Sequence, residues 1–184
     1  MELLDPGFRM TLRHILKSAT TAPREAQKIL SMVLAEELLI PSRTVFLAAP
    51  WISDIVIFEN SVGNFDGLNP EWGHKEIRLI EVLSSIVANN TRLVIRVRPN
   101  TPQNEKFKSR LSIKLLDAGL LDLLDWAEVP DFHTKGLLTD RVWIGGSMNF
   151  TNNGIDVNAE SLIVDFDPEK VAGLRIEFSS YVHE

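Results

Sequence analysis

Apolar positions recur at helical spacing in the first part of the chain. They predict two helices, over residues 8–20 and 23–39. Pro23 suits the first turn of the second helix. The apolar face of that helix is made by Ile29, Leu30, Val33, Leu34 and Leu38. The continuous apolar run 44–52 is rich in strand formers and predicts a buried strand.

The middle of the chain alternates between a polar loop, helices and a strand. Residues 59–73 hold the turn formers and predict a long loop, and loops of this length often carry function. An apolar stripe predicts a helix over 74–90, and alternation over 92–99 predicts a strand. A further helix is expected over 103–118, where Gly119 would end it.

Short strands dominate the last third of the chain. Asp140-Arg141 is predicted to be a tight turn between two of them, and Asp167-Pro168 is a typical cap and first turn for a final helix. The predicted strands are 125–130, 134–140, 141–147 and 159–167. With crossover helices early and hairpins late, this order predicts an α/β fold, a mixed β-sheet flanked by helices.

Length and composition predict one domain over residues 1–184, with an N-terminal helical segment at 1–40 and a core at 41–184. The chain has no cysteine, which excludes disulfides, thiolate zinc sites and cysteine nucleophiles. We recognise no signal peptide and no apolar run long enough to span a membrane. We therefore expect a cytoplasmic protein without a membrane partner.

Charge is unevenly distributed along this acidic chain, whose formal net charge is −6. Residues 92–114 hold seven basic residues and one acid, whereas 117–131 hold five acids and no base. Two interpretations stay open. The basic stretch is either a local face for phosphate groups or an ordinary solvated surface.

A set of polar groups interrupts the apolar strands near residue 140. His133 and Lys135 are two apart, as are Ser147 and Asn149, so strand periodicity predicts that each pair shares a face. A hairpin turning at 140–141 would bring Lys135 roughly opposite Ser147. Each residue alone is more often an ordinary polar side chain. Together, an imidazole, a cation and two hydrogen-bond donors suit holding an anion and attacking it.

The sequences "HTKGLLTD" and "GSMN" resemble the HKD motif of the phospholipase D superfamily, which is written HxKxxxxD followed by GSxN. "NAE" at residues 158–160 is similar to a further motif of that family, and the Pro50-Trp51 ending of the first strand is similar too. The matching motif positions are His133, Lys135, Asp140, Gly146, Ser147 and Asn149. The resemblance implies a phospholipase D-like fold with one HKD half per chain.

Two departures from the family pattern stand in this sequence. Five residues separate Asp140 from Gly146 where six are usual, which a shortened hairpin turn would absorb. Gly136 stands where a larger aliphatic residue is usual, and we expect looser packing behind the histidine.

The resemblance implies phosphodiester transfer through a phosphohistidine, with no metal or other cofactor. His133 would be the nucleophile or the acid, Lys135 and Asn149 would bind phosphate, Ser147 would support them, and Glu160 would orient His133. Asp140 completes the motif. Because the chain holds a single motif, the resemblance also implies a homodimer that brings two copies of His133 together. The other histidines, His14, His74 and His183, have no such motif around them.

We therefore predict a nuclease that cleaves DNA or RNA, and of the two we favour DNA as its partner. By analogy with small proteins of the family, its partners would include other proteins of a bacterial defence or DNA-modification system. Two alternatives remain: a degenerate member that binds nucleic acid or assembles with a partner, and a phospholipase, for which 55–72 would supply an apolar surface.

Overall fold

The computed structural model describes residues 11–17, 24–157 and 160–180. Its main sheet has seven strands in the order β1-β9-β8-β7-β2-β5-β6, and a separate pair is formed by β3 and β4. The strands are β1 (Leu12–Lys17), β2 (Thr44–Ala48), β3 (Val56–Glu59), β4 (Glu76–Arg78), β5 (Arg92–Val97), β6 (Leu124–Glu128), β7 (Gly136–Leu138), β8 (Trp143–Gly146) and β9 (Glu160–Asp165). The helices are α1 (Glu25–Leu39), α2 (Leu79–Ala88), α3 (Pro102–Asp117) and α4 (Pro168–Ser180), with short turns η1 (Pro70–Trp72), η2 (Leu121–Leu123) and η3 (Asn153–Val157).

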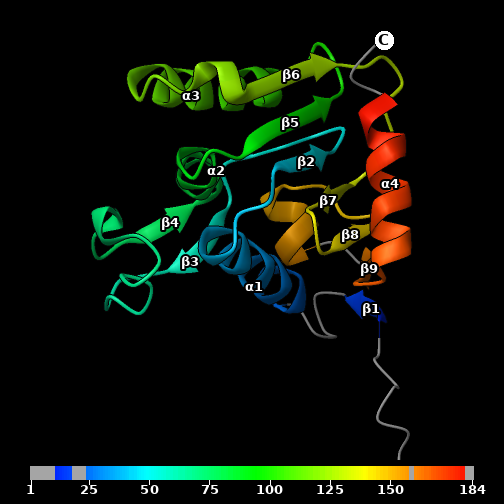
Figure 1. Ribbon diagram of the computed structural model, residues 1–184, viewed down its shortest axis with the longest axis horizontal. Helices are drawn as coiled ribbons and strands as arrows, with labels where there is room; N and C mark the ends of the chain where they lie inside the picture. Colours follow the sequence, from blue (N-terminus) through cyan, green and yellow to red (C-terminus); the bar gives the residue numbers. More distant parts are fainter. Residues whose placement is uncertain (1–10, 18–23, 158–159, 181–184) are drawn as a thin grey trace, which may run out of the picture.

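The sheet is mixed, as the sequence predicts. β2, β5 and β6 are parallel neighbours, and Figure 1 shows the arrows of β5 and β6 running side by side in one direction. β7, β8, β9 and β1 continue from β2 as antiparallel strands. Parallel strands need long crossovers, which here contain α2 and α3, whereas the antiparallel strands β7 and β8 are joined by a short turn.

Helices cover both faces of the sheet. α1, α2 and α3 lie on one side and α4 on the other (Figure 1). Side chains of β2 alternate accordingly, with Val45 and Leu47 in the larger core and Phe46 and Ala48 in the smaller core beneath α4. No helix in the part of the chain that the structure describes is long and apolar enough to cross a membrane.

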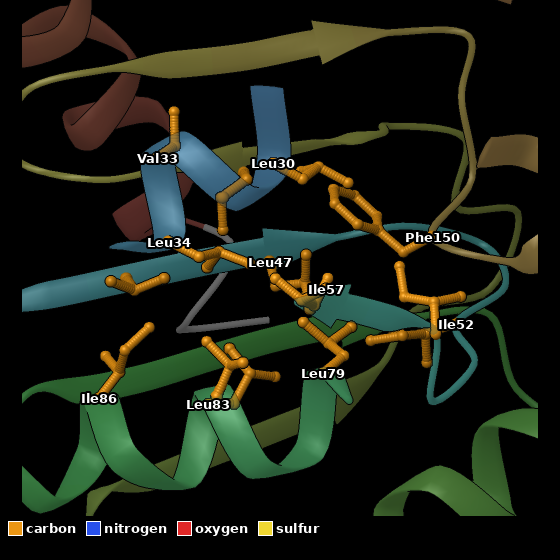
Figure 2. Packing of buried hydrophobic residues seen from close by; sticks show 14 of the residues in the cluster. Leu30, Val33, Leu34, Leu47, Ile52, Ile57, Leu79, Leu83, Ile86 and Phe150 are labelled. Carbon is orange, nitrogen blue, oxygen red and sulfur yellow. The ribbon is translucent and has the colours of Figure 1, made fainter. Parts of the chain in front are cut away.

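The larger core lies between the sheet, α1 and α2. Figure 2 shows Leu30 and Leu34 of α1 facing Leu47 of β2, with Leu83 and Ile86 of α2 beneath them. These side chains are almost completely buried. Burying an aliphatic side chain of this size contributes about 1.5–3 kcal/mol, so this layer gives the sheet a rigid support.

Two of the predicted elements are wrong in part. Residues 12–17 form a strand rather than a helix, because they pair along the whole length of β9 and satisfy its edge. The predicted N-terminal helical segment is therefore not wholly helical, and the rest of 8–20 lies outside the described residues. The helix predicted over 74–90 begins at Leu79, because Glu76–Arg78 pair with β3 as β4.

Other predicted boundaries are confirmed. Gly119 takes a positive φ of 70° after α3, and the Gly119 and Leu120 amides donate to the carbonyls of Leu116 and Leu115. Asp167 accepts a hydrogen bond from the Glu169 amide at 3.0 Å, which caps α4. Local chemistry at these helix ends agrees with the tertiary structure.

Candidate active site

One end of the main sheet brings distant parts of the chain together. β2 and β5 end there, and the start of β7 pairs with the end of β2 through Gly136 and Ala48. β8 ends beside the start of β9, where Gly146 pairs with Leu162. We call this the site end. Loops that follow parallel strands meet at such an edge, which is where α/β proteins commonly bind ligands.

His133 lies at the site end, in the segment that leads into β7. Its side chain is exposed, and the Arg98 Nη2 atom is 3.4 Å from each of its ring nitrogens. The same Nη2 atom donates to the Phe132 carbonyl at 3.3 Å. Lys135 Nζ donates to the backbone carbonyl of His133 at 2.9 Å. An imidazole and two cations therefore occupy a small region that suits an anionic ligand.

The predicted strand geometry of this segment is wrong in two respects. β7 begins at Gly136, so His133 and Lys135 precede the strand and strand periodicity does not set their directions. The register pairs Gly136 with Gly145, and its continuation places Lys135 beside Gly146 rather than Ser147. The chain approaches β7 as a loop because β2, its partner, ends at Ala48.

Ser147 and Glu160 form a second polar pair at the site end. The Ser147 hydroxyl donates to the Glu160 carboxylate and accepts from the Ser161 amide at 3.0 Å. Ser147 N in turn donates to Ser161 O at 3.0 Å. Among the described residues, no hydrogen bond joins Glu160 to His133, and Asn158 of the second motif lies outside them.

Asn149 is held tightly by its backbone but has an unsatisfied side chain. A Cβ atom at Gly154 would lie 2.3 Å from the Asn149 carbonyl oxygen, so the two backbones meet at a distance that only glycine allows. Asn149 Oδ1 is buried without a hydrogen-bond partner among the described residues. A buried amide group without a partner costs stability and can be satisfied by a ligand.

Asp140 is not brought together with the other predicted site residues. It lies at the opposite end of the sheet, in the β7–β8 turn, where its carboxylate pairs with Arg175 of α4 and accepts from the Arg43 amide at 3.0 Å. Thr139 N donates to Val142 O at 3.0 Å, which closes a tight turn around Asp140-Arg141. This turn accommodates the short spacing between Asp140 and Gly146.

The expectation of loose packing at Gly136 is wrong. A Cβ atom at Gly136 would lie 1.9 Å from Cη2 of Trp143, and one at Gly145 would lie 2.4 Å from Cζ2 of the same ring. The Trp143 ring also packs edge-on against Phe178 of α4, with centroids 5.3 Å apart. The indole therefore fills the space that an aliphatic side chain at Gly136 would take.

Sequence reasoning did not assign a role to two further side chains at this end. Arg98 follows β5 and reaches His133, and its guanidinium carbon lies 5.2 Å from the ring centroid of Trp51. Trp51 follows β2 and is 39% exposed. The available signals in the sequence were the Pro50-Trp51 pair after the strand that is β2 in the structure, and the position of Arg98 within the basic stretch.

Most of the basic stretch is neutralised by neighbouring acids. Arg92 and Arg96 both bind Asp125, at 2.7 and 2.9 Å. Burial raises the pKa of the Asp125 carboxyl, but hydrogen bonds from the two arginines outweigh that effect, so the pKa is lowered overall. Lys108 pairs with Glu128 and Arg110 with Asp54. The described part of the chain shows no group of three or more residues arranged to hold a metal ion.

The fold is shared with solved structures over nearly the whole chain. NucT from Helicobacter pylori matches with a TM-score of 0.60 at 13% identity, covering 92% of this chain and 94% of that one. Nuc from Salmonella typhimurium, a phospholipase D family member, matches at 0.56 and 11%, covering 92% and 91%. TrmBL2, an archaeal chromatin protein, matches at 0.55 and 13%, covering 93% of this chain and 51% of its own.

Sequence comparison identifies the family. A search of curated proteins finds no significant match. Residues 76–182, more than half of the chain, match the family model described as the cardiolipin synthase, phospholipase D-like domain. This match spans β4 to β9 together with α2, α3 and α4, whereas β2 precedes it. The chain therefore belongs to the phospholipase D-like domain family.

Proposed function

We propose that this protein is a metal-independent phosphodiesterase that cleaves nucleic acid, DNA in preference to RNA, through a phosphohistidine. The observation that carries the proposal is the grouping of exposed His133 with Lys135 and Arg98 at the site end of the sheet. Family membership and the shared fold of the nucleases NucT and Nuc support it. An imidazole beside cations suits attack on a phosphodiester.

The proposed reaction has two displacements. A neutral ring nitrogen of His133 attacks phosphorus, a nitrogen–phosphorus bond forms, and the bond to the leaving oxygen breaks while that oxygen takes a proton from an acid. Water then attacks the phosphohistidine and gives its proton to the conjugate base of that acid, the nitrogen–phosphorus bond breaks, and His133 is released with a new phosphate end. Lys135 and the Asn149 amide would stabilise the charge on the non-bridging oxygens in both steps. Ser147 and Glu160 would support this arrangement through their hydrogen bond.

The acid is proposed to be His133 of the partner subunit in a symmetric homodimer. Within one chain, His14 lies on β1 and His74 is bound to Asp66 at 3.2 Å beyond β3, so neither is placed beside His133 by the described contacts. A two-fold axis near the site end would supply a second imidazole without a second motif. The oligomeric state in solution tests this part separately.

The decisive experiment compares cleavage by wild type, His133→Ala and His74→Ala in excess EDTA. Substrates are single- and double-stranded DNA and RNA, together with vesicles containing phosphatidylglycerol. We expect nucleic-acid cleavage that survives EDTA, is lost in His133→Ala and is kept in His74→Ala, the matched histidine control. Cleavage that disappears on chelation would contradict the mechanism, and turnover of the lipid alone would contradict the substrate.

A nucleic-acid-binding module without catalysis is the second candidate. The Glu160 carboxylate is bound to Ser147 rather than His133, which leaves the imidazole without the expected carboxylate partner. The fold shared with TrmBL2, described as an archaeal chromatin protein with a novel mode of DNA binding, favours the same candidate. Tight DNA binding by a dimeric wild-type protein that cleaves none of the substrates would select it.

A further inference from the structure

Trp51 and Arg98 form a pair at the site end whose parts come from different strands. Trp51 follows β2, Arg98 follows β5, and the guanidinium carbon is 5.2 Å from the indole centroid. The Arg98 Nη2 atom reaches His133 at 3.4 Å. The pair therefore connects an exposed aromatic ring to the proposed nucleophile through a cation.

A buried asparagine holds both chain segments of this pair. Asn104 of α3 is 1% exposed, and its Nδ2 donates to the carbonyls of Pro50 and Arg98, each at 2.9 Å. Its Oδ1 accepts from the Ile52 amide at 3.0 Å. Asn104 thus binds the residue on each side of Trp51 and the backbone of Arg98 at once. The two backbone segments that carry Trp51 and Arg98 are therefore positioned before any ligand arrives.

The same segment is tied to the strand end that carries Asn149. Ile52 forms a parallel bridge with Phe150, and Ser53 N donates to Phe150 O at 2.8 Å. Figure 2 shows Ile52 and Phe150 side by side. Trp51 and Asn149 are the residues that precede this bridge on its two segments. The backbone of Trp51 therefore lies next to the backbone of Asn149, the residue whose amide is proposed to bind phosphate.

The chemistry of the pair favours a nucleotide. An exposed aromatic face stacks on unpaired bases, and a guanidinium binds phosphate oxygens through two donors. A quaternary ammonium headgroup also binds aromatic rings, but the Arg98 cation at this ring would repel it. A base within a duplex has both faces covered by its neighbours, so it cannot stack on Trp51.

We propose that Trp51 and Arg98 form a nucleotide subsite adjoining His133, in which Trp51 stacks on an unpaired base and Arg98 binds the phosphate of the same strand. The proposal rests on the proposed function and deepens it, because it makes single-stranded nucleic acid the substrate. Asn104 is the positioning residue of this subsite.

Binding to a catalytically silent protein tests the subsite independently of cleavage. In the His133→Ala background, anisotropy is measured with a labelled single-stranded oligonucleotide, its abasic analogue and the matching duplex. Trp51→Leu should weaken binding of the single strand by about 5- to 100-fold, as loss of one stacked base does. It should leave the abasic strand and the duplex unchanged. Trp51→Phe should retain most of the affinity.

Matched variants separate the subsite from general effects on the fold. Trp126→Leu removes the other tryptophan that lies under a cation, Lys108, on the edge strand β6, and should not change affinity. Arg98→Gln should weaken binding of the normal and abasic strands alike and reduce the slope of log affinity against log salt by about 0.7, the value for one phosphate on a single strand. Arg92→Gln, at the opposite end of β5, should change neither the affinity nor the salt slope.

The outcomes distinguish this proposal from the proposed function. Equal losses for Trp51→Leu and Trp126→Leu, or a loss that is the same on abasic strands, would overturn the subsite even if wild type cleaves DNA. No binding of any single strand would overturn it as well. Trp51-dependent single-strand binding by a protein that cleaves nothing would keep the subsite and refute the nuclease. Trp51-dependent binding to phosphatidylcholine vesicles instead would assign the ring to a lipid headgroup.

Discussion

The two ends of the central sheet differ in how their polar groups are satisfied. At the site end, His133 is exposed, Asn149 Oδ1 has no partner among the described residues, and Arg98 Nε is likewise buried without one. At the opposite end, which we call the hairpin end because it holds the β7–β8 turn, charged groups are paired with one another. Arg141 binds Glu36 and Glu37, and Arg175 forms an ion pair with Asp140 Oδ1, an atom that is buried and has no hydrogen bond among the described residues.

At the hairpin end, the buried Glu37 carboxylate is held by several partners. Glu37 is 0% exposed, and burial raises the pKa of its carboxyl although hydrogen bonds from Ser42 and the charge of Arg141 act in the opposite direction. Both Ser42 groups, N and Oγ, donate to it, at 3.0 and 2.9 Å. These contacts fix α1, the start of β2 and the turn against each other.

Two residues of the same motif, Asp140 and Lys135, therefore lie at opposite ends of the sheet and have different roles. The Asp140 carboxylate lies at the hairpin end, where it contacts Arg43 and Arg175, and it has no contact with His133. Lys135 lies at the site end, where its Nζ donates to the His133 carbonyl. Unsatisfied groups cost stability and are retained where a ligand binds, whereas satisfied networks hold the elements that carry them.

His133→Ala should reduce phosphodiester cleavage by at least about a thousandfold, because it removes the proposed nucleophile. Its melting temperature should match that of wild type, since the side chain is exposed. Asp140→Asn should show the reverse: a lower melting temperature with cleavage per folded molecule retained. Steady-state rates and thermal melts on both variants test the contrast, which fails if Asp140→Asn abolishes cleavage in a fully folded protein.

Arg141→Ala should destabilise the fold by about 3 kcal/mol, because it leaves the buried Glu37 carboxylate without its cation. The melting temperature should fall by roughly 6–12 °C, at about 2–4 °C per kcal/mol for a chain of this size. Adding Glu37→Gln to this variant should restore part of the lost free energy of unfolding. Denaturant unfolding measures both, and a double variant no more stable than Arg141→Ala would refute the pairing.

Gly136→Val should cost about 2 kcal/mol, because the new side chain overlaps the Trp143 ring. Trp143→Leu removes the overlap with the ring, while the Ile144 carbonyl oxygen, 2.5 Å from such a Cβ, stays in place. The double variant should therefore be more stable than the sum of the single changes predicts, by roughly 1 kcal/mol or more. Gly67→Ala, where a Cβ meets nothing within 4 Å, is the matched control. Additive losses would show that Trp143 does not occupy the space.

The smallest effect is a pH dependence at the hairpin end. Because the pKa of Glu37 is raised above 4.5 in the fold, the folded state binds the proton more tightly than the unfolded state. The free energy of unfolding relative to Glu37→Gln should therefore be highest below pH 4.5 and fall as pH rises from 4.5 through the folded pKa. Urea unfolding of both proteins across this range measures it, and a rise in that window would contradict the assignment.

Much of the fold could be predicted because its signals are local. Gly119 ends α3 and Asp167-Pro168 begins α4 through contacts within a few residues. The structure of residues 12–17 could not be predicted, because apolar spacing in a short segment fits a helix or a strand. Pairing with β9, about 150 residues later in the chain, decides between the two. The start of α2 was displaced by the same kind of non-local pairing, between β3 and β4.

For the site, the sequence alone determined the chemical set: one histidine, one lysine and the Gly-Ser-x-Asn turn at spacings that resemble the family motif. Only the tertiary structure separated Asp140 from that set and added Trp51 and Arg98 to it. The physical reason is the strand order. Strands far apart in the chain become neighbours in the sheet, so their ends lie together at the site end. The β7–β8 hairpin brings its two chain ends to that same end and places its turn, which holds Asp140, at the opposite end.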